Sequence, residues 1–252
     1  MLEPTGLLCE YRTDPLGIDV ANPRLSWRST SSQRGARQTA WQVVVASDAA
    51  GLASGDFLWD SGRVEGSTSF HHAYGGPPLR SRQRCWWQVR LWDEAGEASP
   101  WSAPAWWEMG LLDAGDWQAA WIAPDWYEDT RTAEPCPMLR RVVELEGDVA
   151  SARLYVTALG LYDARINGQA VSDWAFTPGW TTYRHRLQYQ TYDVTNLLQA
   201  GANALAVTLG DGWYRGYLGF QGKRNYYGEN LALLLHLHVT YADGSEALFG
   251  SD

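Results

Sequence analysis

Apolar and polar residues alternate in short segments along most of the chain, and turn residues separate these segments. In residues 85–92, CWWQVRLW, every second side chain falls on one face of an extended strand, and that face is apolar. Residues 41–47 predict another strand, and residues 58–62 and 100–109 predict weaker ones. We expect the last of these at a sheet edge, since proline lacks the N–H that a central strand donates. Together these segments predict an all-β protein.

A second set of alternating segments follows in the second half of the chain. Residues 151–160 and 231–241 each present an apolar face, and Asn167-Gly168 lies between alternating runs. An Asn-Gly pair predicts a tight hairpin, because both turn positions need a positive φ. The last apparent strand, residues 246–250, stands almost at the end of the sequence. We therefore expect this domain to be cut at its C-terminal end, with at least one further strand to follow.

The alternation fades between these two sets of strands. Residues 111–137 hold three prolines and several acids, and their apolar residues follow no clear period. We interpret this stretch as a linker, partly packed through Trp117 and Trp121. The sequence thus predicts two β-sandwich domains, at residues 1–110 and 138–252.

Composition narrows the classes of partner. Fifteen Trp and thirteen Tyr far outnumber five Phe, and both carry a polar group beside the ring, which favours wet, ring-lined surfaces as well as cores. The net charge of −9 argues against nucleic acid as a partner, because phosphate binding needs a basic face. No stretch approaches the roughly 18 apolar residues of a membrane span.

Cysteine usage and the first residues bear on localisation. Cys9, Cys85 and Cys136 are odd in number, widely spaced and without a CxxC pair, so we expect neither a disulfide scaffold nor a zinc knuckle. The start, MLEPTGLLCEYRTDP, lacks the apolar run of a signal peptide. We therefore expect a reducing, cytoplasmic location.

The motifs of several enzyme classes are missing. The sequence holds no GxSxG, no GxGxxG and no GxxxxGK[ST], which argues against a serine hydrolase and against nucleotide cofactors. His236 and His238 lie two apart on one predicted strand and so share a face, but no third metal ligand matches their spacing. We expect that face to be the solvent side of a half-buried strand, and we predict no metal site there.

Carboxylates leave two further alternatives open. Glycoside hydrolysis needs a pair of acids, and Asp163, Asp211 and Glu229 are acids flanked by rings. Loop carboxylates more often bind hydroxyls or turn backbones, so we favour that role. No DxDxDG loop is present, although carbonyl oxygens with Asp or Asn could still hold calcium.

Two glycine-broken segments concentrate aromatic and polar side chains, and neither has the period of a strand or a helix. They are residues 177–193, TPGWTTYRHRLQYQTYD, and residues 210–230, GDGWYRGYLGFQGKRNYYGEN. Sugars bind on aromatic rings together with side chains that hold hydroxyls in fixed directions. The candidate carbohydrate-binding residues are Trp180, Tyr183, Arg184, Asp211, Trp213, Tyr214, Arg215, Asn225, Tyr226, Tyr227 and Glu229. The alternative is that these rings close the end of the sandwich or face another domain.

Several long stretches have the look of one enzyme family. They are CEYRTDPLGIDVANPRLSW, WDSGRV, PLRSRQRCWWQVRLWDEAGEASPWS, WWEMGLL, ALGLYDARINGQAV, TPGWTTYRHRLQYQTYDVTNLL, LGDGWYRG and NYYGENLALLLHL. From about Leu8 onward the chain resembles the N-terminal region of bacterial α-L-rhamnosidases. The resemblance implies a fibronectin III- or immunoglobulin-like β-sandwich followed by a jelly-roll domain similar to carbohydrate-binding modules.

The same resemblance implies a role without catalysis. In that family the catalytic residues lie in a later (α/α)₆ barrel, and nothing in this sequence resembles that barrel. Some relatives bind rhamnose with calcium, but the GWTTYRHR loop offers Arg184 and His185 in place of a carboxylate and an amide. The expected partners are rhamnose-containing glycans and the barrel of the same protein. A stand-alone lectin-like protein and a purely structural module are the alternatives.

Overall fold

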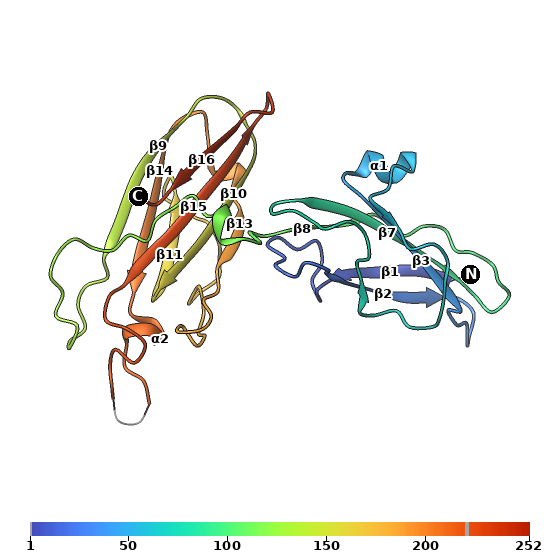
Figure 1. Ribbon diagram of the computed structural model, residues 1–252, viewed down its shortest axis with the longest axis horizontal. Helices are drawn as coiled ribbons and strands as arrows, with labels where there is room; N and C mark the ends of the chain where they lie inside the picture. The colour runs from blue at the N-terminus through green and yellow to red at the C-terminus, as the bar shows by residue number, and fades with distance from the viewer. Residues whose placement is uncertain (1, 220–221) are drawn as a thin grey trace. The chain divides into compact units, whose positions relative to one another are not determined.

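The computed structural model describes residues 2–219 and 222–252, which form two compact units (Figure 1). Unit 1 comprises residues 1–116 and unit 2 residues 117–252. Each unit is a sandwich of two antiparallel sheets, so the all-β prediction is confirmed. No helix in the described part of the chain is long and apolar enough to span a membrane.

Unit 1 pairs a three-stranded sheet with a five-stranded one. The first has the order β1 (Leu2–Cys9), β2 (Arg24–Ser31), β6 (His72–Ala73). The second has the order β4 (Trp59–Asp60), β3 (Ala40–Ala46), β7 (Arg84–Trp92), β8 (Ala105–Glu108), and β5 (Val64–Glu65) also pairs with β3. One helix, α1 (Ala49–Ser54), begins where Asp48 accepts a hydrogen bond from the Gly51 N–H, and a short 3₁₀ turn covers Ala114–Asp116.

Strand β7 shows how the sequence pattern becomes structure. Its predicted apolar face, from Cys85 to Leu91, is fully buried in the core of unit 1. The opposite face carries arginines that lie over tryptophan rings. The Arg90 guanidinium carbon is 5.0 Å from the Trp92 ring and 4.7 Å from the Trp101 ring. Part of the tryptophan excess therefore serves cation–π contacts on the outside of this sheet.

His72 of unit 1 lies between two tryptophans. Its ring stacks on Trp27 at 4.8 Å and lies 4.1 Å from Trp41. Burial lowers the pKa of His72 below its usual value, the hydrogen bond to the Thr68 carbonyl acts in the opposite direction, and the neighbouring His71 lowers it further. The fold therefore favours the neutral ring.

This lowered pKa predicts that unit 1 loses stability in mild acid. Below the ordinary histidine pKa the unfolded chain takes up a proton that the folded state resists, so stability is present above about pH 6.5 and falls below it. We expect the urea midpoint of unit 1 to be lower at about pH 5.5 than at pH 7.5, and the difference to shrink in His72→Phe. Urea melts followed by tryptophan fluorescence measure both. An unchanged pH dependence in the variant would assign the effect to other groups.

Unit 2 consists of two four-stranded sheets around one core. One sheet has the order β13 (Gln190–Asp193), β10 (Val149–Leu159), β15 (Ala232–Tyr241), β16 (Glu246–Gly250). The other has the order β12 (Gln169–Ala170), β11 (Leu161–Ile166), β14 (Gly201–Gly210), β9 (Met138–Leu145). Two short elements complete the unit, a 3₁₀ turn at Thr195–Leu197 and the single-turn helix α2 (Gly212–Arg215). The apolar faces of both sheets meet in the core.

The predicted hairpin at Asn167-Gly168 is confirmed. Both residues have positive φ, at 52° and 82°, and they join β11 to β12. The prediction for the histidines of β15 is wrong, because His236 is fully buried and His238 is 8% exposed. Rings cover that face of the strand: the ring of Tyr155 lies 5.9 Å from that of His236, and the ring of Trp117 lies 6.4 Å from it.

The stretch interpreted as a linker contributes to unit 2. Ile122 exchanges backbone hydrogen bonds with Leu233, at 3.0 and 2.8 Å, and the Ala120 N–H donates to the Ser251 carbonyl at 2.7 Å. Residues 120–122 thus pair with the β15 sheet beside Leu233 and Ser251 and extend it. A pairing of only three residues is too short to produce the alternation of apolar and polar residues by which a strand is predicted from sequence.

Candidate functional site

The two ring-rich segments meet at one end of unit 2, beside α2 (Figure 1). We call the rings that contact one another there, together with Phe176 just before the first segment, the aromatic cluster; it consists of Phe176, Trp180, Tyr183, Trp213, Tyr214, Tyr226 and Tyr227. The rings of Trp180 and Trp213 are nearly parallel, 5° apart in plane, with centroids 5.9 Å apart. Tyr183 joins the segments again, at 5.3 Å from Tyr214 and 4.9 Å from Tyr227.

The aromatic cluster has a supporting layer and an exposed layer. Tyr214 is partly buried and packs against the core of unit 2, as the alternative reading of the rings expected. Phe176, Trp180 and Tyr226 are 68%, 56% and 58% exposed. Burial raises the pKa of Tyr183, and so does Tyr227 beside it, so Tyr183 remains a neutral phenol. The partly buried rings of the cluster therefore support the exposed rings, whose surfaces are open to solvent.

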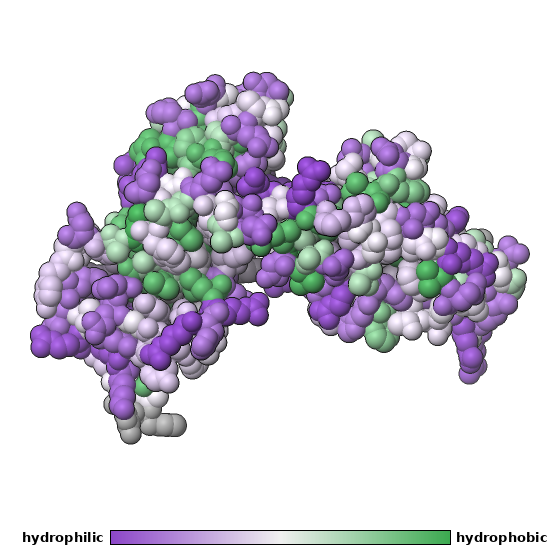
Figure 2. Space-filling view, in the orientation of Figure 1, coloured by the Kyte–Doolittle hydropathy of each residue, from purple (hydrophilic) through white to green (hydrophobic). Residues whose placement is uncertain are grey.

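Hydrogen bonds between the segments hold the exposed rings. Trp180 Nε1 donates to the Tyr227 hydroxyl at 3.1 Å, and Arg184 Nη2 donates to the Tyr226 carbonyl at 3.1 Å. The Tyr183 hydroxyl donates to the Gly179 carbonyl at 3.0 Å. On the visible face in Figure 2, the α2 end of unit 2 is mostly white and purple, as expected for a surface of Trp, Tyr and charged residues.

Two glycines permit this arrangement. Gly212, at the start of α2, has φ +52°, and a Cβ there would lie 2.5 Å from Leu161 Cγ. A Cβ on Gly228 would lie 2.0 Å from the Tyr214 hydroxyl. At these two glycines of residues 210–230 the chain thus passes too close to its neighbours for any larger residue.

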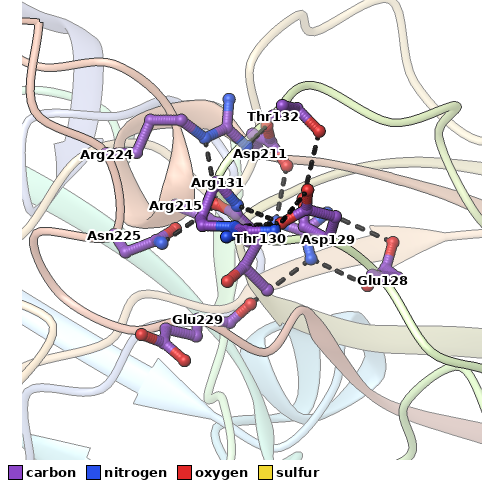
Figure 3. Close-up of polar contacts among 10 residues, drawn as sticks. All are labelled: Glu128, Asp129, Thr130, Arg131, Thr132, Asp211, Arg215, Arg224, Asn225 and Glu229. Atoms are coloured by element: carbon purple, nitrogen blue, oxygen red, sulfur yellow. Dashed lines mark hydrogen bonds and ion pairs between the residues drawn. The ribbon is translucent and has the colours of Figure 1, made fainter.

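Arg215 is buried, and its guanidinium connects α2 to a distant segment (Figure 3). Its Nε donates to Asp211 Oδ1 at 2.7 Å, and its Nη1 donates to Glu128 Oε2 at 2.7 Å. Burial acts to lower the pKa of Arg215, but Glu128 and Asp211 outweigh it and raise the pKa, so the side chain keeps its charge. The second oxygen of Asp211 accepts from Arg224 Nη2 at 2.7 Å.

This network gives three of the candidate residues partners within the protein. Arg215 is only 2% exposed and cannot reach a sugar, and both carboxylate oxygens of Asp211 are taken by guanidinium groups. Asn225 donates its amide to the Thr130 carbonyl at 3.0 Å, which leaves it inside the loop. These side chains hold residues 128–130 against α2.

The recorded contacts of the Glu229 and Asp163 side chains do not involve the aromatic cluster. The Glu229 side chain is exposed and lines an open hollow of about 730 Å³ together with Trp126 and Tyr127. Asp163 forms an ion pair with Arg165 at 3.1 Å. Asp211, the third of the ring-flanked acids, is engaged by Arg215 at 2.7 Å. Within residues 2–219 and 222–252, no three His, Cys, Asp or Glu side chains gather where they could hold a metal ion.

A second hollow lies between the two sheets of unit 2, where strands β9 and β16 form the open edges. It has a volume of about 410 Å³, and apolar core side chains such as Val143 and Leu235 line it. Arg141 of β9 crosses this gap and donates to the Gly250 carbonyl at 2.7 Å and to the Asp252 carboxylate at 2.5 Å. Sequence reasoning missed this residue, because an arginine within an edge strand carries no signal of an inward direction.

The comparisons with known families cover most of the chain. Residues 4–113 match the N-terminal immunoglobulin domain of Rha78A-like proteins. Residues 147–252 match the α-L-rhamnosidase N-terminal domain. The predicted order of an immunoglobulin-like sandwich and a rhamnosidase N-terminal domain is therefore confirmed.

Individual relatives agree with these matches. An α-L-rhamnosidase of Formosa agariphila is 41% identical over 248 residues, which cover 95% of this chain and 26% of the relative. An α-L-rhamnosidase of Alteromonas sp. (strain LOR) is 36% identical over a region that covers 98% of this chain and 28% of the relative.

Solved structures have the same fold. The native α-L-rhamnosidase of Aspergillus terreus superposes with a TM-score of 0.89 at 38% identity, over 100% of this chain and 29% of that one. The Streptomyces avermitilis α-L-rhamnosidase, solved in complex with L-rhamnose, gives a TM-score of 0.87 at 30% identity, over 100% of this chain and 40% of that one. This chain thus spans between 26% and 40% of the length of these relatives. It consists of the N-terminal immunoglobulin-like domain and the N-terminal domain of the α-L-rhamnosidase family, a non-catalytic region of that family.

Proposed function

We propose that the aromatic cluster of unit 2 is a carbohydrate-binding surface that serves a longer α-L-rhamnosidase. In that enzyme a separate catalytic domain would hydrolyse terminal α-L-rhamnosides, and this region would hold the glycan near it. The observation that carries the proposal is that rings from two separate segments form one exposed surface. Trp180 and Tyr226 are the most exposed rings of this surface that carry a polar group.

The chemistry of the surface suits a sugar. The C–H face of a sugar ring packs on an exposed indole, and fixed hydrogen-bonding groups at the rim select the directions of hydroxyls. The Trp180 indole is held by its bond to Tyr227, so little side-chain freedom is lost when a ligand packs on it. Preorganised rings of this kind bind a saccharide without rearrangement of the loops.

Rhamnose-containing glycans are the ligands that the family suggests. The Streptomyces avermitilis relative is known in complex with L-rhamnose, and we extend that ligand class to this chain as part of the proposal. The exposed rings would contribute affinity for the glycan rather than catalysis, because they lie in a region without a pair of catalytic acids.

A second candidate function is packing against the catalytic domain. Phe176 favours it, since this side chain is 68% exposed and carries no polar atom. Exposed apolar rings of this kind mark interaction surfaces between domains as well as ligand sites. In that case the ring surface would be covered in the whole enzyme and would have no affinity of its own for sugar.

Titration of the 252-residue chain with L-rhamnose distinguishes the two functions. We expect a change in tryptophan fluorescence with a Kd in the millimolar range, weakened about tenfold in Trp180→Ala, because one ring contact is worth about 1 kcal/mol or more. Trp121→Ala is the matched control, since this tryptophan is exposed on unit 2 outside the aromatic cluster, and it should bind as the parent does. Absence of binding up to about 50 mM would instead support the packing function.

A further inference from the structure

Two polar residues of the segment 210–230 already have partners within the protein. Each carboxylate oxygen of Asp211 accepts from a guanidinium group, and the Asn225 amide nitrogen donates to the Thr130 carbonyl. The Glu229 side chain lines the separate hollow with Trp126 and Tyr127. Of the two acids in this segment, one is thus paired with guanidinium groups and the other lines the hollow.

The arginines of the first ring-rich segment, in contrast, have exposed side chains. Arg184 is exposed and uses one N–H for the Tyr226 carbonyl, and a guanidinium has five N–H donors in a fixed fork. Arg186 follows on the same tight turn, where its backbone N–H donates to the Thr182 carbonyl at 3.0 Å and its carbonyl accepts from the Thr181 hydroxyl at 2.6 Å. Its side chain is also exposed. One arginine thus contacts the ring segments and a second follows it on the same turn, in a chain whose net charge is −9.

We infer that the aromatic cluster takes an acidic saccharide, a uronate, with the Arg184 guanidinium as the group that binds its carboxylate. This inference rests on the proposed function and names the ligand class of the same surface. The ring of Trp180 would carry the C–H face of the sugar, while the planar fork of Arg184 matches a carboxylate in two parallel hydrogen bonds.

The free N–H groups of Arg184 explain why a charged sugar is favoured over a neutral one. The hydroxyls of a neutral sugar accept from a guanidinium without a charge of their own. A carboxylate only accepts, so it uses the free N–H groups of Arg184 without leaving a donor opposed to a donor. Hydrogen bonds between ionised partners are also about twice as strong as neutral ones.

The test compares two ligands that differ at one carbon. The 252-residue chain is titrated with methyl β-D-glucuronoside and with methyl β-D-glucoside by calorimetry at about 20 mM salt and at about 0.5 M salt. We expect the glucuronoside to bind about tenfold more tightly at low salt, and the difference to shrink to about twofold at high salt, where the charges are screened.

Three variants assign the effect to one side chain. Arg184→Gln should lose the preference for the glucuronoside, and the ratio of the two affinities within this variant cancels any effect that loss of the bond to the Tyr226 carbonyl has on the rings. Arg184→Lys keeps the charge without the fork and should retain only part of the preference. Arg140→Gln removes the same charge from an exposed arginine on β9 and should behave as the parent.

The outcomes separate this inference from the function on which it rests. Equal affinity for the two glycosides, or a preference that survives in Arg184→Gln, overturns the assignment of an acidic sugar and leaves a neutral carbohydrate site. If neither glycoside nor L-rhamnose binds at about 50 mM, the carbohydrate function itself fails and the acidic sugar fails with it.

Discussion

Replacement of Arg215 by methionine is expected to lower the free energy of unfolding of unit 2 by about 3 to 5 kcal/mol. The side chain is 2% exposed, and its removal leaves the carboxylate of Glu128 without its guanidinium partner and that of Asp211 with Arg224 alone. Methionine fills a similar volume, so the loss reflects charge more than packing. Urea denaturation followed by far-UV circular dichroism measures it.

Two further variants separate the causes of that loss. Arg165→Met removes an exposed arginine from its ion pair with Asp163 and should cost about 0 to 1 kcal/mol. Arg215→Met combined with Glu128→Gln should recover part of the stability, because one uncompensated carboxylate is gone. Equal stabilities of Arg215→Met and Arg165→Met would show that the buried network contributes nothing to the unit.

Substitution of Gly212 by alanine is the second large effect that we expect, at about 2 to 4 kcal/mol. The residue has φ +52°, which costs an L side chain energy, and the new Cβ would lie 2.5 Å from Leu161 Cγ. Since α2 carries Trp213 and Tyr214, its displacement should also weaken the aromatic cluster. Thermal melts and the L-rhamnose titration report these two consequences.

Gly244→Ala is the matched control for that variant. Gly244 also has a positive φ, +85°, but nothing lies within 4 Å of the position where its Cβ would be. This variant should therefore show only the backbone cost, about 1 kcal/mol. If both variants lose the same stability, the close approach of Leu161 plays no part.

Much of the fold followed from local patterns, because those patterns report which face of a strand is apolar. The alternation in residues 85–92 and the Asn167-Gly168 turn are properties of neighbouring residues, and the structure has them where they were predicted. His236 shows the limit of such reasoning. A strand that alternates leucine with polar residues indicates one buried face, but it does not show that Tyr155 and Trp117 cover the other.

The candidate site was predictable in its rings and not in its charges. Both ring-rich segments were recognised from composition, and the aromatic cluster joins them through Trp180 and Trp213. A charged residue on a loop was expected to face solvent or ligand, whereas Arg215 is buried. Its partner Glu128 lies 87 residues away in the stretch interpreted as a linker, and no local signal connects two such positions.

The arginine that crosses the open flank of unit 2 bears on how copies of the chain behave toward one another. Edge strands are the places where separate molecules extend each other's sheets into aggregates, and a charge turned inward at an edge opposes such growth. Arg141 stands at this position, anchored to Gly250 and Asp252. The Arg141 guanidinium is thus a charge at this edge that opposes the pairing of separate copies through their open strands.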